Sequence, residues 1–192
     1  MLIGVLGLQG DVIEHVAMLR RIVGKDGVKI VKYASEIEGL NGLIIPGGES
    51  TTICDLMVKY GVDEAIKGHK NLTIFGTCAG TIVLAKEIVG QDEQSSLKLM
   101  DIKVKRNAYG RQRESFEVDL EIPALEGEPF RAVFIRAPTI VGHKRDVEVL
   151  AELDGNPVIA RQRKILVSSF HPELTDDPRM HSYFVNMVDE RG

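Results

Sequence analysis

The chain has 192 residues, of which 44% are hydrophobic and 27% are charged, and its formal net charge is −4. This balance is ordinary for a globular protein and predicts a single domain over residues 1–192. The slight acidity predicts no nucleic-acid partner and no anionic membrane partner. Two cysteines are too few for a disulfide framework and favour a reducing, cytoplasmic compartment. No apolar run approaches the roughly 18 residues that a membrane span needs.

The first half of the chain alternates strand-like and helix-like segments. A helix is expected after Asp11, which can cap it, and another from about Ser50 to Tyr60. Buried strands are expected at Leu2–Leu6, Val28–Val31, Leu43–Ile45 and Leu72–Phe75. This alternation predicts an α/β fold with a parallel sheet and helices on both faces.

The second half of the chain is richer in strands. Asp101–Lys105 and Ser115–Ile122 alternate polar and apolar residues, so each has one wet face and is expected to be antiparallel or at a sheet edge. Further elements are expected as strands at Ala132–Ile135, Val147–Ala151, Val158–Arg161 and Ile165–Ser168 and as a helix at about Pro178–Glu190.

The segment Gly76–Gly80 has the pattern of a nucleophile elbow. It follows a strand-like run, precedes a helix-like run at Thr81–Lys86, and places Cys78 between two glycines. A turn this sharp leaves no room for side chains at the flanking positions. The cysteine would lie at a helix N-terminus, where the dipole favours a thiolate. The segment therefore indicates acyl chemistry through a thioester.

Of five histidines, only His171 has a suggestive context. Pro172 favours an extended conformation at His171, so His171 and Glu173 are expected to project in the same direction. Glu173 could then hold one imidazole nitrogen while the other faces Cys78. Taken alone, the segment fits an ordinary surface turn better than a triad. Together with the elbow it favours a Cys78, His171 and Glu173 triad.

Pro46–Thr52 is a glycine-rich turn that follows a strand and opens a helix. The backbone N–H groups of Gly48 and Ala79 could hold an oxyanion there. The alternative is a simple turn in which Ser50 or Thr51 caps the helix. A phosphate loop is disfavoured because no lysine follows at the required spacing.

Other features of the sequence say less about function. The glycines of Gly4–Gly10 are spaced three and three, which does not match a dinucleotide-binding loop. Cys54 is expected to be a buried apolar residue. The cysteines and histidines do not cluster, so no metal site is expected. The chain also has a group of three arginines, Arg106, Arg111 and Arg113. This group could be a solvated sheet edge, or it could bind a substrate carboxylate.

These motifs together resemble the class I (triad) glutamine amidotransferases from end to end. The cysteine elbow and His171-Pro172-Glu173 are common to that class. Narrower motifs resemble the glutaminase subunits of pyridoxal 5′-phosphate synthases: Pro46–Thr52, Arg106-Asn107 with Gly110-Arg111-Gln112, and Phe134–Pro138.

The resemblance implies a flavodoxin-like three-layer α/β fold and hydrolysis of L-glutamine to L-glutamate and ammonia, with no cofactor. It implies that Cys78 attacks the amide, that His171 acts as base and then acid, and that Glu173 orients His171. Gly48 and Ala79 would bind the oxyanion. The glutamine pocket would be lined by Gly48, Glu49, Ser50, Arg106, Ile135 and Arg136.

The ammonia would pass to a separate synthase subunit, a (β/α)₈ barrel that makes pyridoxal 5′-phosphate (vitamin B6). Three alternatives remain open from the sequence. The chain could feed another acceptor, such as imidazole glycerol phosphate synthase, or it could be a non-catalytic regulatory subunit. It could also be a redox-protective cysteine protein, a class that has the elbow cysteine but lacks the late His-x-Glu pairing.

Overall fold

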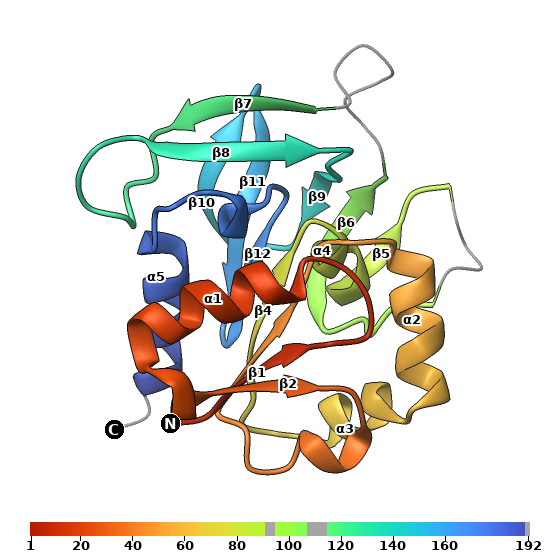
Figure 1. Cartoon of the computed structure of the whole chain (residues 1–192). Helices are drawn as coiled ribbons and strands as arrows, with labels where there is room; N and C mark the ends of the chain where they lie inside the picture. Colours follow the sequence, from red (N-terminus) through yellow and green to blue (C-terminus); the bar gives the residue numbers. More distant parts are fainter. Residues whose placement is uncertain (91–94, 107–114, 191–192) are drawn as a thin grey trace.

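The computed structural model describes residues 1–90, 95–106 and 115–190, and its centre is a seven-stranded sheet (Figure 1). The strands are β1 (Ile3–Leu6), β2 (Val28–Val31), β3 (Gly42–Ile45), β4 (Thr73–Thr77), β10 (Glu148–Leu153), β11 (Asn156–Gln162) and β12 (Ile165–Ser168). Their order across the sheet is β10-β11-β12-β4-β3-β1-β2. Neighbours from β12 to β2 are parallel, so their carboxyl ends meet at one edge of the sheet.

Helices cover both faces of this sheet. The helices are α1 (Val12–Val23), α2 (Ser50–Lys59), α3 (Val62–Gly68), α4 (Ala79–Leu84) and α5 (Arg179–Asp189). Helices α1 and α5 pack on one face and α2, α3 and α4 on the other. The expected three-layer α/β architecture is therefore confirmed. Among the described residues, no helix is long and apolar enough to cross a bilayer.

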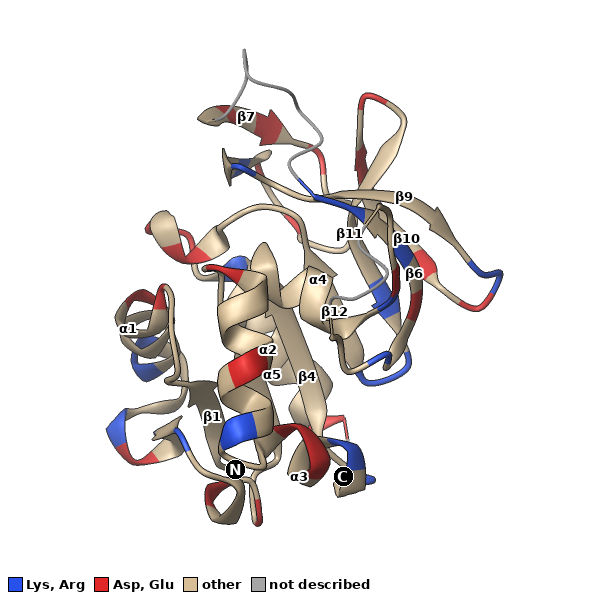
Figure 2. Cartoon of the chain, turned by 90° about the vertical axis from the view of Figure 1, so that its right-hand side faces the viewer, with Lys and Arg blue, Asp and Glu red and all other residues tan. Residues whose placement is uncertain are grey.

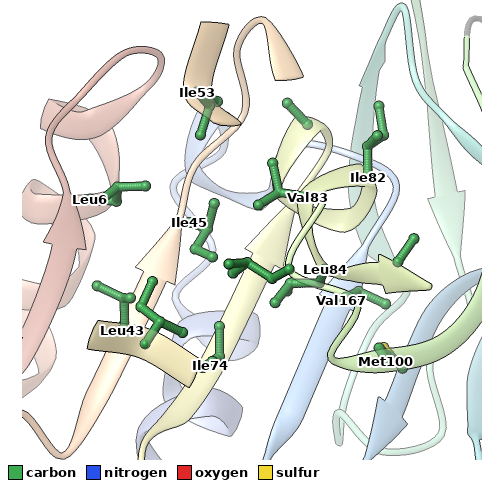
Figure 3. Packing of buried hydrophobic residues seen from close by; sticks show 14 of the residues in the cluster. Leu6, Leu43, Ile45, Ile53, Ile74, Ile82, Val83, Leu84, Met100 and Val167 are labelled. Atoms are coloured by element: carbon green, nitrogen blue, oxygen red, sulfur yellow. The ribbon is translucent and has the colours of Figure 1, made fainter. Parts of the chain in front are cut away.

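Strand β3 shows how the sequence produces two cores. Its residues alternate between the faces, so Ile44 packs in the layer of α1 and α5 while Leu43 and Ile45 pack in the other layer. Figure 3 shows Ile45 in the same cluster as Ile53 of α2 and Val83 of α4. Because both faces are buried, the strand reads as a continuous apolar run rather than as an alternating pattern.

Two smaller sheets accompany the central sheet. One contains β5 (Ala85–Ile88), β6 (Met100–Lys105) and β9 (Thr139–His143), and the other is the hairpin of β7 (Ser115–Leu120) and β8 (Phe130–Ile135). The hairpin is antiparallel, as its alternating sequence predicts. Strand β6 is antiparallel to β9, as one of the two expectations for Asp101–Lys105 has it. It lies in the centre of its sheet and not at an edge, because it also pairs in parallel with β5.

Charged residues of both signs are interspersed along the described chain (Figure 2). On the hairpin, Arg131 bonds to Glu117 at 2.9 Å and to Asp119 at 3.1 Å. Each of these side chains is at least half exposed, so these pairs add little to stability. Arg131 offsets part of the negative charge of β7.

The helix-like run after Cys78 is shorter than its sequence predicts. Helix α4 ends at Leu84, and Ala85 turns to an extended conformation with ψ 144°. Ala85 then pairs with Met100 in a parallel ladder. The apolar residues are buried in either conformation, so their pattern alone does not distinguish the helix from the strand. Helix α3 and strand β9 are also absent from the sequence prediction.

The packing of α1 on the sheet gives a stability prediction. Leu19 has no exposed surface, whereas Ile13 on the same helix is 65% exposed. We expect Leu19→Ala to lower the free energy of unfolding by about 2–5 kcal/mol, because it leaves a cavity between α1 and the sheet. The matched Ile13→Ala change should stay within about 0.5 kcal/mol of the native chain. Urea unfolding measures both, and equal effects would contradict this packing.

Candidate active site

Cys78 lies in the sharp turn between β4 and α4. Its backbone has φ 47° and ψ −102°, an unusual conformation for a residue with a side chain. A methyl group at Gly80 would lie 2.1 Å from the backbone oxygen of Ile45, and one at Gly76 would lie 2.7 Å from Gly80 O. The Cys78 N–H donates to Ser168 O at 2.8 Å, which ties the turn to β12. The glycine spacing of the elbow is therefore a steric requirement.

His171 follows β12 and is held next to Glu173. Its backbone N–H donates to Val133 O at 2.8 Å, and its Nδ1 lies 2.7 Å from Glu173 Oε1. Both residues are only 5% exposed. The nearby Cys78 thiol helps to raise the pKa of the His171 imidazole. The structure thus brings together the three residues that the sequence analysis joined.

The electrostatics of this cluster favour a proton on His171. Burial would lower the pKa of the imidazole, but hydrogen bonds to Asp11, Cys78 and Glu173 outweigh burial and raise the pKa well above its ordinary value. Burial raises the pKa of the Glu173 carboxyl, and its contact with His171 opposes that rise. A buried imidazolium surrounded by acceptors is the state that these contacts stabilise.

Asp11 takes a place that the sequence did not predict. Its side chain makes no capping hydrogen bond to α1, so the cap prediction is wrong. The carboxylate Oδ2 instead lies 3.2 Å from His171 Nδ1, and the backbone N–H donates to Gly47 O at 3.2 Å. Asp11, His171 and Glu173 offer metal-ligand types within 4.8 Å of one another. The 2.7 Å contact between His171 and Glu173 is a normal hydrogen bond, which accounts for the cluster.

The glycine-rich turn packs against the elbow and against the loop after β1. The Gly47 N–H donates to Thr77 Oγ1 at 3.1 Å, just before the elbow cysteine. The Glu49 N–H donates to Gln9 Oε1 at 2.7 Å. A methyl group at Gly10 would lie 1.7 Å from Gly47 O, so this approach requires glycine. The conformation of the turn thus depends on two other segments.

Helix α2 is capped by Glu49 rather than by Ser50 or Thr51. The Glu49 carboxylate accepts hydrogen bonds from the backbone N–H groups of Thr51 and Thr52, which a Glu side chain can reach because it folds back over the first turn. Burial alone would raise the pKa of Glu49, but the Thr51 hydroxyl and the bonds from Thr52 lower it to about 2. Arg106 Nη2 lies 3.0 Å from Glu49 Oε1. A fixed carboxylate and a guanidinium therefore stand side by side.

A pocket of about 420 Å³ opens beside Cys78. Nine residues predicted for the site line it: Gly48, Glu49, Ser50, Cys78, Ala79, Arg106, Ile135, Arg136 and His171. Glu173 lies behind His171 and does not line the pocket. Three further residues line it without having been predicted to do so: Gln9, Asp11 and Ile82. Cys78 Sγ lies 3.8 Å from the backbone oxygen of Ile135, at the pocket wall.

Two further arginines and a second cysteine remain from the sequence analysis. Arg111 and Arg113 lie outside the described residues, as do Asn107, Gly110 and Gln112 of the same motif. Cys54 is buried in α2 as expected, and burial raises the pKa of its thiol to about 11. Cys78 is therefore the free cysteine that reaches the pocket.

Two fully buried histidines lie behind the triad. His15 Nδ1 of α1 is 2.9 Å from His181 Nε2 of α5. Burial lowers the pKa of His15 well below its usual value, and the neighbouring His181 and His171 lower it further. Burial also lowers the pKa of His181 to about 4. Both rings are neutral at pH 7, and no local pattern in the sequence indicates that they meet.

A family model described as the SNO glutamine amidotransferase family matches residues 5–190. The chain belongs to this family. It is 54% identical over 192 residues to the pyridoxal 5′-phosphate synthase subunit PdxT of Niallia circulans, with 99% of each chain covered. It is 52% identical to the protein of the same name from Thermotoga neapolitana, covering 98% of this chain and 100% of that one.

Solved structures agree with this assignment. One described as a glutamine amidotransferase is 50% identical with a TM-score of 0.92, covering 98% of this chain and 100% of its own. A putative GMP synthase component from Thermoplasma acidophilum has a TM-score of 0.72 at 19% identity, covering 99% of this chain and 95% of its own. The second likeness concerns the fold alone.

The buried histidine pair predicts sensitivity to acid. Between pH 6.5 and about 4, the unfolded chain binds a proton at His181 that the folded chain does not, so stability is highest above pH 6.5 and falls as the pH falls. From pH 7 to pH 5 the native chain should lose about 2 kcal/mol more unfolding free energy than His181→Gln, which lacks this titration. Urea unfolding at both pH values measures the difference. Parallel losses in the two chains would contradict the lowered pKa.

Proposed function

We propose that this chain hydrolyses L-glutamine to L-glutamate and ammonia through a thioester on Cys78. One observation carries the proposal: a strained elbow holds Cys78 at a pocket that is also lined by a buried His171, which Glu173 supports. Family membership and relatives named as pyridoxal 5′-phosphate synthase subunits support the same function. Residues 1–192 act as one glutaminase domain.

The reaction proceeds in two halves. Cys78 Sγ, whose proton has passed to His171, attacks the side-chain amide carbon of glutamine, and the backbone N–H groups of Gly48 and Ala79 bind the oxyanion that forms. His171 gives its proton to the amide nitrogen as the carbon–nitrogen bond breaks, which releases ammonia and leaves a γ-glutamyl thioester. Water then attacks the thioester, His171 accepts a proton from that water, and glutamate leaves. Glu173 keeps the His171 ring oriented throughout.

The pocket residues fit the other end of glutamine. Free glutamine carries an α-ammonium and an α-carboxylate, so its binding site needs opposite charges close together. Glu49 and Arg106 provide a carboxylate and a guanidinium joined at 3.0 Å, and Arg136 adds a second guanidinium at the pocket wall. Ser50 and Ile135 complete the lining. Substrate charges would replace part of the contact that Glu49 and Arg106 make with each other.

Ammonia released here passes to a pyridoxal 5′-phosphate synthase subunit, a (β/α)₈ barrel, in a hetero-oligomer that makes vitamin B6. The names of the relatives, which match along their whole lengths, support this acceptor. A cytoplasmic location is supported by the two free cysteines, both buried.

Glutamate release tests the proposal. It is measured from L-glutamine with the native chain, Cys78→Ala and Cys54→Ala, each alone and with the barrel subunit. We expect release that the barrel stimulates, that falls about a thousandfold or more in Cys78→Ala, and that persists in Cys54→Ala, because Cys54 does not line the pocket.

The outcomes separate the alternatives. If a verified complex releases no glutamate, the chain is not a glutaminase and a regulatory role takes precedence. If glutamate release occurs but is not stimulated by the barrel subunit, the glutaminase activity is supported and the proposed ammonia acceptor is wrong. Loss of release in Cys54→Ala as well would point to damaged folding rather than to catalysis.

A further inference from the structure

The triad carboxylate has one oxygen that the triad does not use. Glu173 Oε1 holds His171, while Oε2 is completely buried and has no hydrogen-bond partner within the described part of the chain. The nitrogen His15 Nε2 lies 3.4 Å from this oxygen. A buried carboxylate oxygen needs a donor nearby, and His15 is placed to supply it.

His15 also contacts the second half of the site. Its Nε2 lies 3.1 Å from Thr77 Oγ1, the same oxygen that accepts the Gly47 N–H. Gly47 precedes Gly48, to which we assign part of the oxyanion site. One imidazole nitrogen therefore faces both the carboxylate behind His171 and the hydroxyl that anchors the glycine-rich turn.

The buried surroundings select one tautomer of the histidine pair. If His15 Nδ1 donated to His181 Nε2, then His181 Nδ1 would have to carry a buried N–H, and that atom has no partner among the described residues. The bare His15 Nε2 would also face the Glu173 carboxylate. In the opposite tautomer His181 donates to His15 Nδ1, and His15 Nε2–H donates to Thr77 Oγ1 with Glu173 Oε2 3.4 Å from the same nitrogen. Only the second arrangement leaves no buried donor of this pair without an acceptor.

We propose that His15 is a positioning residue for the triad: its Nε2–H bonds to Thr77 and attracts the adjacent Glu173 carboxylate, and His181 fixes its tautomer. This inference rests on the proposed function, since it assigns a role at the same site. His15 does not reach the pocket and acts through Glu173 and Gly47. Its neutral ring adds no positive charge beside His171, so it can orient the carboxylate without weakening its attraction for the imidazolium.

The test measures how fast iodoacetamide alkylates Cys78, with peptide mapping to separate it from Cys54. At pH 7 the rate depends on the triad to stabilise the reactive thiolate, whereas at pH 10 a thiol ionises without that help. We expect His15→Leu to slow the reaction about tenfold at pH 7 and to match the native rate at pH 10. His15→Gln keeps a donor directed at Glu173 and should stay within about twofold of native at both pH values.

Two further variants serve as a control and as a second test. Val16→Ala, a buried change on the same helix, controls for loosened packing and should match native at both pH values. His181→Leu leaves His15 in place but removes the donor that sets its tautomer, so it should slow alkylation at pH 7 only. If His15→Leu does not fold, His181→Leu still tests the proposal.

The proposal fails if the His15 and His181 variants react at the native rate at pH 7, or if they slow equally at both pH values. It also fails if His15→Gln is no better than His15→Leu. Alkylation needs no glutamine, so a native chain without glutaminase activity would reject the proposed function and leave this test intact. In an active complex, His15→Leu should lower kcat with little change in KM, because His15 does not touch the substrate pocket.

Discussion

The candidate active site depends on the backbone conformation at Cys78. A residue with φ 47° and ψ −102° carries strain of about 1–3 kcal/mol, which its surroundings must offset. Two contacts do so in the described structure. The Cys78 N–H is bonded to Ser168 O, and Gly80 packs directly on the backbone of Ile45. The turn is thus clamped between two neighbours of β4, and the thiol has little freedom to leave the pocket.

The parallel sheet explains why the other site residues arrive at the same place. Strands β1, β3, β4 and β12 all end at one edge, and each continues into a segment of the site. Gln9 and Asp11 follow β1, Gly48 follows β3, Cys78 follows β4 and His171 follows β12. Segments from both ends of the chain therefore meet without any long loop having to reach across the molecule.

Local geometry made part of this site predictable from sequence. The spacing of Gly76, Cys78 and Gly80 encodes its own turn, and His171 and Glu173 are only two positions apart. Asp11 could not be predicted in the same way, because an aspartate before a helix looks like an ordinary cap. Its actual partner, His171, lies across the sheet. The buried histidines show the same limit more strongly, because His15 and His181 meet only where α1 and α5 share a face of the sheet.

The most direct test of the central claim is to trap the acyl-enzyme. The chain, together with the proposed barrel subunit, is mixed with L-glutamine and quenched in acid during turnover. Its intact mass and peptides are then measured by mass spectrometry. Thioester catalysis at Cys78 predicts an adduct with the mass of a γ-glutamyl group on the peptide containing Cys78, removable by hydroxylamine as thioesters are. Steady glutamate release with no adduct at all on Cys78, or an adduct on Cys54, would contradict it.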